Sequence, residues 1–70
     1  MKEMLSNRVY DLRTAAGKTQ EELAEAVEVT RQTIIALEKG NYSPSVQLAL
    51  KISHFFNKCV DEVFYISHGK

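Results

Sequence analysis

Residues 19–40, TQEELAEAVEVTRQTIIALEKG, contain two short helix patterns in tandem. The first opens with Thr19 and Glu22, which have the spacing of a capping box and predict a helix that begins immediately after Thr19. The second has Thr30 as its N-cap and Gly40 placed to end it in a left-handed conformation. The gap between the patterns is too short for antiparallel packing, so the helices are expected to cross steeply, as in a helix-turn-helix.

Apolar residues recur at helical spacing in both patterns. In the first, Leu23, Ala24 and Val27 form one face, and the glutamates fall largely on the opposite side. In the second, Ile34 and Leu37 are three residues apart and point inward. Each helix is therefore predicted to bury one face and to leave the other in solvent.

The outward face of the second helix has the chemistry of a major-groove surface. Arg31 can donate two hydrogen bonds to guanine, and Gln32 can pair with adenine. Lys39, at the far end, is placed to meet phosphate. An ordinary solvated helix face is the alternative, and Ile35 fits that alternative only if it packs under Tyr42. Methyl groups that can contact thymine are offered by Thr33, Ile35 and Ala36.

A spaced set of residues extends this pattern over most of the chain: Gln20, Leu23, Ala24, Val29, Thr30, Arg31, Gln32, Thr33, Ile34, Leu37, Glu38 and Gly40, then Pro44-Ser45, Leu48 to Ile52 and Val63-Phe64. Together they resemble the Cro and phage-repressor helix-turn-helix family, also called the xenobiotic-response-element family. The resemblance covers residues 7–64 and implies five helices, of which the second and third read DNA. The short length and the TRQTI and QLALKI runs are similar to small regulators of that family, such as the cytolysin-operon repressor, a dimer with a short β-ribbon beyond its helices.

The resemblance also implies roles for individual residues. Gln20 matches a glutamine that contacts phosphate and braces the recognition helix. Arg13 and Glu38 match a pair that often forms a salt bridge between the first and third helices. The positions that face bases or adjoining phosphates are Thr30, Arg31, Gln32 and Thr33, and those that contact the DNA backbone after the helix are Lys39 and Asn41.

Two residues depart from the family pattern. Glu28 stands where the family usually has glycine, so either the turn is of another type or Glu28 accepts a left-handed backbone at some cost. Ala36 occupies a position that is often long and polar, which would replace one hydrogen bond to a base by a methyl contact. The following loop, residues 41–44, reads equally as a phosphate clamp that uses Asn41 and Tyr42 or as ordinary turn chemistry.

The rest of the chain is predicted to support these two helices. An opening helix over Ser6–Ala16 would carry Val9, Leu12 and Ala16 inward and stop at Gly17, and a fourth helix, capped by Ser45, would span Val46–Phe56. After a helical turn near residues 61–63, the run Val63-Phe64-Tyr65-Ile66 has strand character, and Met4-Leu5 can pair with it. The predicted fold is all-α: one lambda-repressor-like five-helix DNA-binding domain over residues 1–70, to which a short terminal two-stranded β-ribbon can be added.

The fourth helix is apolar over more than half of its circumference and needs cover on two sides. A 70-residue chain has a marginal core and a lone ribbon is unstable in water, so a homodimer is predicted. A compact monomer is the alternative. The predicted dimer surface lies within residues 46–67 and comprises Leu48, Phe55, Val60, Phe64, Tyr65 and Ile66.

The net charge is zero, but the charges are unevenly distributed. Four glutamates lie in residues 21–28, whereas residues 1–18 and 29–60 are net basic, so a basic surface can face phosphate. Two recognition helices related by a two-fold axis would enter major grooves about 34 Å apart on an inverted repeat. This predicts a sequence-specific transcriptional regulator, and a repressor where the operator overlaps a promoter. The alternative is an antitoxin-like module whose apolar C-terminal surface holds a partner protein.

Other functions find no support in the sequence. It has no acidic cluster, metal set or nucleophile with a base, so no enzyme, catalytic residue, metal or cofactor is predicted. Cys59, the single cysteine, reads as a small residue near the core edge, with a redox role as the weaker alternative. No export or membrane segment is visible, so we expect a cytoplasmic protein whose partners are double-stranded DNA and a second copy. No small-molecule effector is expected, because no sensory domain is visible.

Overall fold

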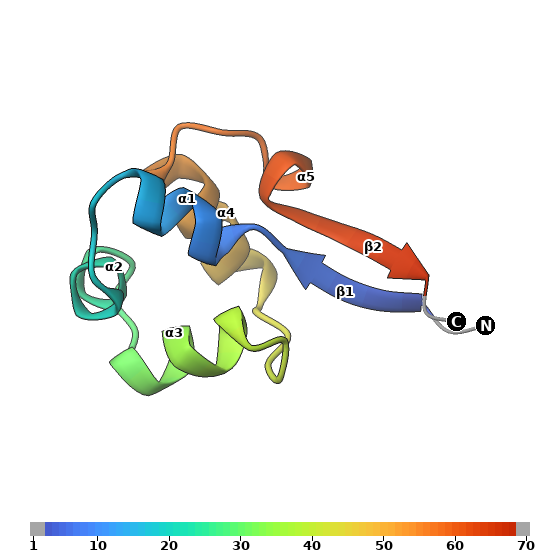
Figure 1. The fold of residues 1–70 in the computed structure, drawn as a ribbon, viewed down its shortest axis with the longest axis horizontal. Helices are drawn as coiled ribbons and strands as arrows, with labels where there is room; N and C mark the ends of the chain where they lie inside the picture. The colour runs from blue at the N-terminus through green and yellow to red at the C-terminus, as the bar shows by residue number, and fades with distance from the viewer. Residues whose placement is uncertain (1–2, 69–70) are drawn as a thin grey trace.

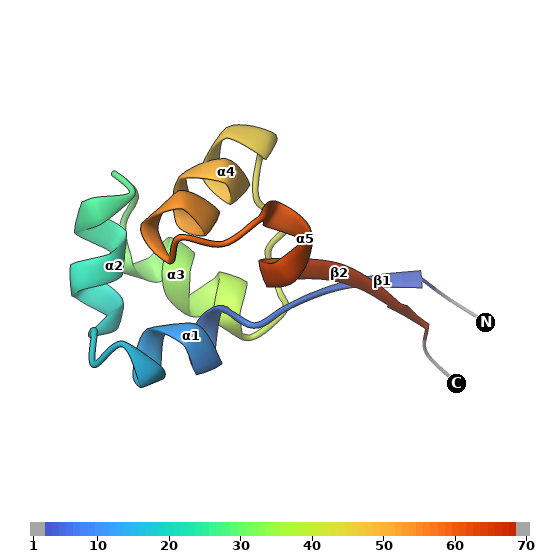
Figure 2. The same ribbon diagram turned by 90° about the horizontal axis from the view of Figure 1, so that it is seen from above.

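The computed structural model describes residues 3–68, which form five helices and a small two-stranded antiparallel sheet (Figure 1). Figures 1 and 2 both show the ribbon of the two strands projecting from the helices, with α2 at the opposite end of the molecule. In this part of the chain no helix has the length and apolar character that a membrane crossing needs. In chain order the elements are β1 (Glu3–Asn7), α1 (Val9–Ala15), α2 (Gln20–Ala26), α3 (Arg31–Glu38), α4 (Val46–Phe55), α5 (Val60–Val63) and β2 (Phe64–His68).

The helix starts agree with the predicted caps. At α2, Thr19 Oγ1 accepts the backbone N–H of Glu22 (3.0 Å), and Glu22 Oε1 accepts the backbone N–H of Thr19 (2.8 Å). At α3, Thr30 Oγ1 accepts the backbone N–H of Thr33 (3.3 Å), and Ser45 caps α4 in the same way. These bonds satisfy backbone donors that a helix start otherwise leaves without a partner.

The turn between α2 and α3 contains the departure that the sequence indicated. Glu28 has φ +65°, so it accepts the left-handed backbone in place of glycine. Its carboxylate accepts a hydrogen bond from Lys51 Nζ (2.7 Å), and this bond lowers the pKa of Glu28. In Figure 1 α2 is seen nearly end-on while α3 lies across the page, so the two helices cross steeply.

One apolar core joins the helices. It contains the residues predicted to face inward on α2 and α3, all at most 3% exposed. It also contains Leu48 and Phe64, which the sequence had assigned to the dimer surface. Leu48 lies one turn from the fully buried Ile52, and Phe64 lies at the root of the ribbon, directly after buried Val63, so both are covered by their own chain. The core residues are Val9, Leu23, Ala24, Val27, Ile34, Leu37, Leu48, Ile52, Val63 and Phe64.

The first helix is shorter than predicted at both ends. Asn7 is the last residue of β1, and its Oδ1 accepts the backbone N–H of Val9 (3.0 Å), where α1 begins. The stop at Gly17 is confirmed by its φ of +71°. Ala16 is exposed instead of inward, and Arg13 is buried instead. A helix wheel ranks alanine above arginine for burial because it ignores an acidic partner on another helix.

The ribbon is longer than the predicted pairing of Met4-Leu5. Each strand has five residues, and the register places Leu5 opposite Ile66. Opposite residues share a face, so these two side chains lie together on one side of the ribbon. On the other side Ser6 Oγ and Ser67 Oγ share a hydrogen bond of 2.7 Å. Val63, predicted to start the strand, ends α5 instead, and its side chain is fully buried in the core.

Candidate nucleic-acid interface

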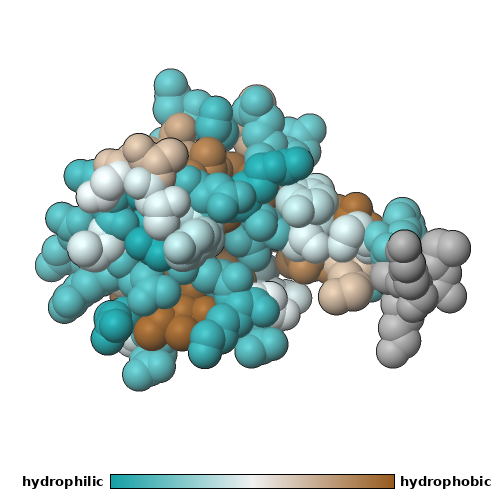
Figure 3. All heavy atoms as spheres, in the orientation of Figure 1, coloured by the Kyte–Doolittle hydropathy of each residue, from teal (hydrophilic) through white to brown (hydrophobic). Residues whose placement is uncertain are grey.

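The outward side of α3 carries polar groups without partners of their own. Arg31 and Gln32 are exposed in its first turn, and Lys39 is exposed at its end. Within residues 3–68 none of these three side chains makes a hydrogen bond or an ion pair. An apolar patch framed by hydrophilic surface lies over α3 (Figure 3). A cation, an amide and methyl groups on one helix face match the donors and contacts that read a major groove. The remaining predicted contacts on α3, which are half-buried, are Thr33, Ile35 and Ala36.

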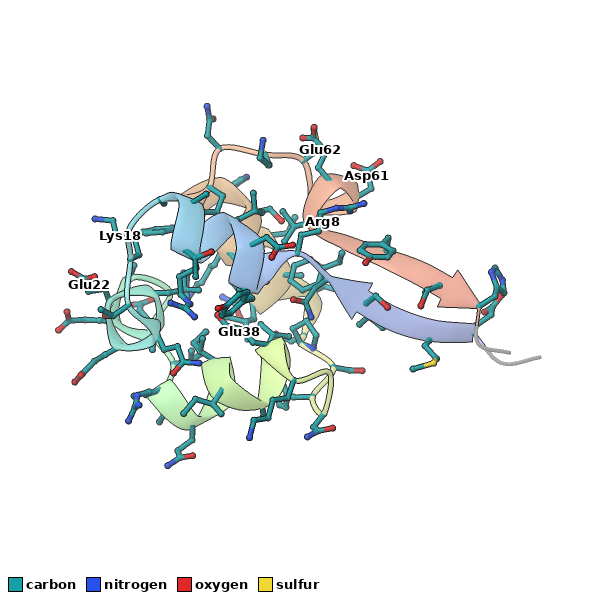
Figure 4. The ribbon with its side chains drawn as sticks, in the orientation of Figure 1. Arg8, Lys18, Glu22, Glu38, Asp61 and Glu62 are labelled. Atoms are coloured by element: carbon teal, nitrogen blue, oxygen red, sulfur yellow. The ribbon has the colours of Figure 1, made fainter. Side chains whose placement is uncertain are left out.

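A buried ion pair fixes α3 against the other helices. Arg13 Nε lies 2.6 Å from Glu38 Oε2, and Arg13 Nη2 donates to Glu38 Oε1 at 3.1 Å. The third donor, Nη1, bonds the carbonyl of Lys18 (2.9 Å) in the loop before α2. The hydrogen bonds that Arg13 donates to Glu38 raise the pKa of Arg13. Figure 4 shows Glu38 between α1 and α3, so the pair implied by the resemblance links these two helices.

Gln20 extends this link to α2. Its Nε2 donates to Glu38 Oε1 at 3.1 Å, which braces the last turn of α3 from the start of α2. Gln20 and Arg31 also line the same open recess, of about 540 Å³, which runs from the loop before α2 to the start of α3. A phosphate contact by Gln20, as the resemblance implies, would therefore lie beside the first turn of the recognition helix.

The loop after α3 leaves its side chains free. Asn41 and Tyr42 are both exposed, and within residues 3–68 neither side chain makes a hydrogen bond. The backbone N–H of Asn41 is already bonded to the carbonyl of Ala36 (2.9 Å), so a phosphate could be met by side chains but not by this amide. The loop offers donors directly beyond the end of α3.

Two acids close to α3 are paired and Glu22 points away from it, whereas Glu21 lines the same recess as Arg31. Figure 4 shows Glu22 on the outer side of α2, away from α3. The hydrogen bond from the backbone N–H of Thr19 lowers the pKa of Glu22. Glu38, the last residue of α3, and Glu28, in the turn before α3, are each bound to a basic side chain. The outward side of α3 itself carries Arg31 and Lys39 as exposed cations despite a net charge of zero.

Four of the predicted dimer residues remain exposed, and other apolar residues join them. Phe55, Val60, Tyr65 and Ile66 are between 37% and 54% exposed. The sequence analysis missed the exposed side chains of Met4 and Leu5, which the strand register places on the same ribbon as Tyr65 and Ile66. Figure 3 shows brown surface on both sides of the ribbon. No alternation of apolar and polar residues marks residues 3–7, EMLSN, and their partner strand is too distant in sequence to show which face they share. Two further exposed apolar residues lie on α4, Val46 and Leu50.

Cys59 is exposed, not at the core edge as predicted. It precedes α5, and its backbone N–H donates to Glu62 Oε1 (2.8 Å), which closes the first turn of that helix. Residues 3–68 contain no group of three or more metal-ligating side chains.

Two short helices joined by a tight turn, the second presenting free donors, define a helix-turn-helix DNA-binding domain. A family model described as helix-turn-helix matches residues 9–63, and the chain belongs to the Cro/C1-type helix-turn-helix family of transcriptional regulators. The resemblance identified in the sequence is therefore confirmed. Over 62 residues the chain is 48% identical to the uncharacterized HTH-type transcriptional regulator YgzD of Bacillus subtilis, covering 89% of this chain and 94% of YgzD.

More distant relatives include both a transcriptional repressor and a transcriptional activator. The repressor RstR of cryptic phage CTXphi in Vibrio cholerae is 33% identical over 60 residues, 86% of this chain and 54% of RstR. The activator BcrR of Enterococcus faecalis is 36% identical over 58 residues, 83% of this chain and 28% of BcrR. The crystal structure of the transcriptional regulator VanUg has the same fold, with a TM-score of 0.79, 24% identity, and coverage of 99% of this chain and 92% of VanUg.

Proposed function

We propose that this regulator is a repressor that binds an inverted-repeat operator as a homodimer. The observation that carries the proposal is the unpaired, exposed state of Arg31 and Gln32 on a helix whose other end is fixed by Glu38. A rigid helix that presents free, directional donors loses little conformational entropy when it enters a groove. The structure thus supports direct readout of bases by the first turn of α3.

The roles follow from side-chain chemistry. Arg31 reads guanine and Gln32 reads adenine, since each can form two hydrogen bonds with one base. The apolar groups on the same face contact thymine methyl groups. The proposed phosphate contacts fix the register of the helix but carry no sequence information. The proposed contacts with thymine methyl groups come from Thr33, Ile35 and Ala36. The proposed contacts with phosphate come from Gln20, Thr30, Lys39, Asn41 and Tyr42.

The homodimer is supported by the polarity of the molecule. Its long axis is 36 Å, with the acidic helix α2 at one end and the apolar ribbon at the other. A two-fold axis beside α2 would bring like charges together, whereas an axis beside the ribbon would bury exposed apolar side chains of a ribbon face, such as Leu5 and Ile66. A two-fold dimer places its recognition helices about one turn of DNA apart, roughly 34 Å.

We infer that the protein represses transcription, and the phage repressor among its relatives supports this inference. The fold does not decide the sign, because an activator also occurs among them. In this proposal the position of the operator relative to the promoter determines the outcome. The protein acts in the cytoplasm, catalyses no reaction, uses no cofactor and needs no small-molecule effector.

Fluorescence anisotropy tests the proposal directly. Wild type is titrated onto DNA from upstream of its own gene and onto scrambled DNA at several salt concentrations. We expect a preference of at least ~10³-fold for its own DNA and a steep loss of affinity as salt rises. The variant Arg31→Ala/Gln32→Ala should bind both DNAs equally and weakly, because only the groups that read bases are removed.

The matched control is Gln47→Ala/Lys58→Ala, which removes one amide and one charge from exposed positions on α4 and the loop after it. The control should keep the wild-type preference. Equal and weak binding of wild type to both DNAs would contradict the operator proposal. The exposed ribbon would then favour the antitoxin-like alternative, in which the apolar surface holds a partner protein.

A further inference from the structure

We propose that Asn7 is a positioning residue that fixes recognition helix α3 relative to the β-ribbon and thereby determines which half-site spacing the dimer accepts. This inference rests on the proposed function, since it needs a dimer joined through the ribbon. Asn7 lies outside the helix-turn-helix and outside every contact with DNA proposed above. It acts through α3 and not through a base or a phosphate.

Both ends of the Asn7 amide are used. Nδ2 donates to the carbonyl of Leu37 at 3.0 Å, and Oδ1 accepts the backbone N–H of Val9 at 3.0 Å. The first bond reaches the last turn of α3, and the second reaches the first turn of α1. Asn7 itself belongs to β1, opposite buried Phe64. One half-buried side chain therefore joins the ribbon to two helices.

No other hydrogen bond within residues 3–68 connects the ribbon to α3. Outside this contact the two separate around an open recess of about 470 Å³, which Ser6, Lys39, Asn41 and Tyr65 help to line. Side-chain packing therefore does not fill the space between the outer ribbon and the end of α3. Apart from the apolar core, which Phe64 joins at the root of the ribbon, the Asn7 amide is the joint between them.

The ribbon side of this joint is held firmly to the body. The backbone N–H of Arg8 donates to the carbonyl of Val63 (2.9 Å), and the Arg8 guanidinium lies 4.4 Å from the centre of the Tyr65 ring. Figure 4 shows Arg8 beside α5 and the start of β2. A ribbon anchored in this way gives Asn7 a fixed point from which to hold α3.

On α3, the bond from Asn7 reaches the last turn of the helix, at Leu37. The carbonyl of Leu37 also accepts the backbone N–H of Gly40 (3.0 Å), in the turn that leads out of the recognition helix. The other fixed point of α3 is Glu38, which is bonded to Arg13 and Gln20. A small rotation of α3 about this point would move the turn and change the distance between the two recognition helices of a dimer. Without the Asn7 bond each helix still reads its half-site, but the dimer tolerates more than one spacing.

Asn7→Asp is the sharpest variant. Aspartate has the same length and keeps the acceptor for Val9, but it cannot donate to Leu37. Asn7→Ser replaces the amide N–H₂ by a shorter hydroxyl without adding a charge, so the bond from Nδ2 to Leu37 is lost, and it keeps the test valid if aspartate disturbs folding. Ser6→Ala is the matched control, because it removes the hydrogen bond to Ser67 inside the ribbon and leaves the joint intact.

The operator is first selected from random duplexes with wild type. Binding is then measured to that operator, to versions with one base pair inserted or deleted at its centre, and to a single half-site. We expect wild type and Ser6→Ala to lose at least ~10-fold affinity when the spacing changes, about the effect of a disrupted base contact. Both Asn7 variants should lose less than ~3-fold, with half-site affinity and the dimer fraction in sedimentation unchanged.

Two results would overturn the inference. One is that the Asn7 variants keep the wild-type dependence on spacing. The other is that their half-site affinity falls as far as their operator affinity, which would indicate a merely structural role. If wild type selects no sequence at all, the proposed function fails first and the inference fails with it. If wild type selects an inverted repeat but the variants match it, only the inference fails.

Discussion

Glu38 is the residue at which three helices meet. Its carboxylate accepts two hydrogen bonds from Arg13 on α1 and one from Gln20 on α2, and its side chain is 5% exposed. A charge in such a position is tolerated only when it is paired and hydrogen-bonded. The recognition helix is consequently held by a polar contact that has no apolar substitute of the same geometry.

Replacing Glu38 by alanine should therefore destabilise the fold through Arg13, which keeps its bond to the Lys18 carbonyl but is left with little solvent and no acidic partner. We expect a loss of about 2 kcal/mol in the free energy of unfolding from urea denaturation, less than for a deeply buried pair because the site lies near the surface of a small body. The double variant Arg13→Met/Glu38→Leu should lose less than Glu38→Ala. A Glu38→Ala loss below the error of the measurement would show that the ion pair contributes nothing to stability.

Residue-level prediction succeeded where a local pattern decides burial. Helical spacing identified Leu23 and Ile34 as core residues because each lies at the centre of an apolar stripe. It failed at Leu48, since an all-round apolar helix does not reveal which side its own chain covers. The burial of Arg13 is likewise invisible to periodicity, because the acid that neutralises it is 25 residues away.

Among the elements, α2 depends most on its first turn. It has only seven residues, and its capping box provides two hydrogen bonds between side chains and backbone. A helix this short forms through tertiary packing and its caps, because its intrinsic propensity is too small. The charge of Glu22 therefore affects the stability of the whole helix.

The pH dependence of stability should reflect this cap. The hydrogen bond from the Thr19 backbone lowers the pKa of Glu22 in the folded state. A lowered folded pKa gives stability that is present above the unfolded pKa and is lost as pH falls through the folded value. Urea denaturation of wild type between pH 7 and pH 3 should show this loss in the free energy of unfolding. Over the acidic part of that range the free energy of unfolding of Glu22→Gln should fall less with pH. Glu25→Gln, at an exposed site on the same helix, is the control, and parallel curves for wild type and Glu22→Gln would contradict the expectation.

Element boundaries followed the sequence wherever a cap or a glycine fixed them. The starts of α2, α3 and α4 and the stop at Gly17 were all predicted from such residues. The start of α1 was predicted too early, because residues 6 and 7 have partners in β2 that a local pattern cannot see. The outward face of α3 was also predictable, whereas Asn7 was not, since its role depends on two elements that meet only in the folded chain.

At the scale of the whole molecule, the ribbon is the surface most in need of a partner. Leu5 and Ile66 share one of its faces, and both are at least 40% exposed. A two-stranded ribbon alone is marginal in water. Burial by a second copy would stabilise both the ribbon and the dimer.

Ile66→Glu should convert the dimer into a monomer, because two-fold symmetry would place two buried carboxylates at one interface. We expect sedimentation to report a monomer and operator affinity to fall by at least ~10²-fold, since the second half-site is lost. Val46→Glu is the matched control, at a more exposed apolar residue on α4, away from the ribbon. A monomeric wild type, or an Ile66→Glu variant that stays dimeric, would refute a dimer joined through the ribbon.

The pairing of β1 with β2 also bears on the order in which the elements fold. Ser6 and Ser67 meet across 61 residues, whereas α2 and α3 are neighbours along the chain. Closing a long loop costs entropy before its contacts form, so folding driven by local contacts should finish first. We therefore expect the helices to pack together early in folding and the two strands of the ribbon to pair last. A newly made chain would possess its reading helix before it could pair with another copy, and control of the target gene would lag behind synthesis of the regulator.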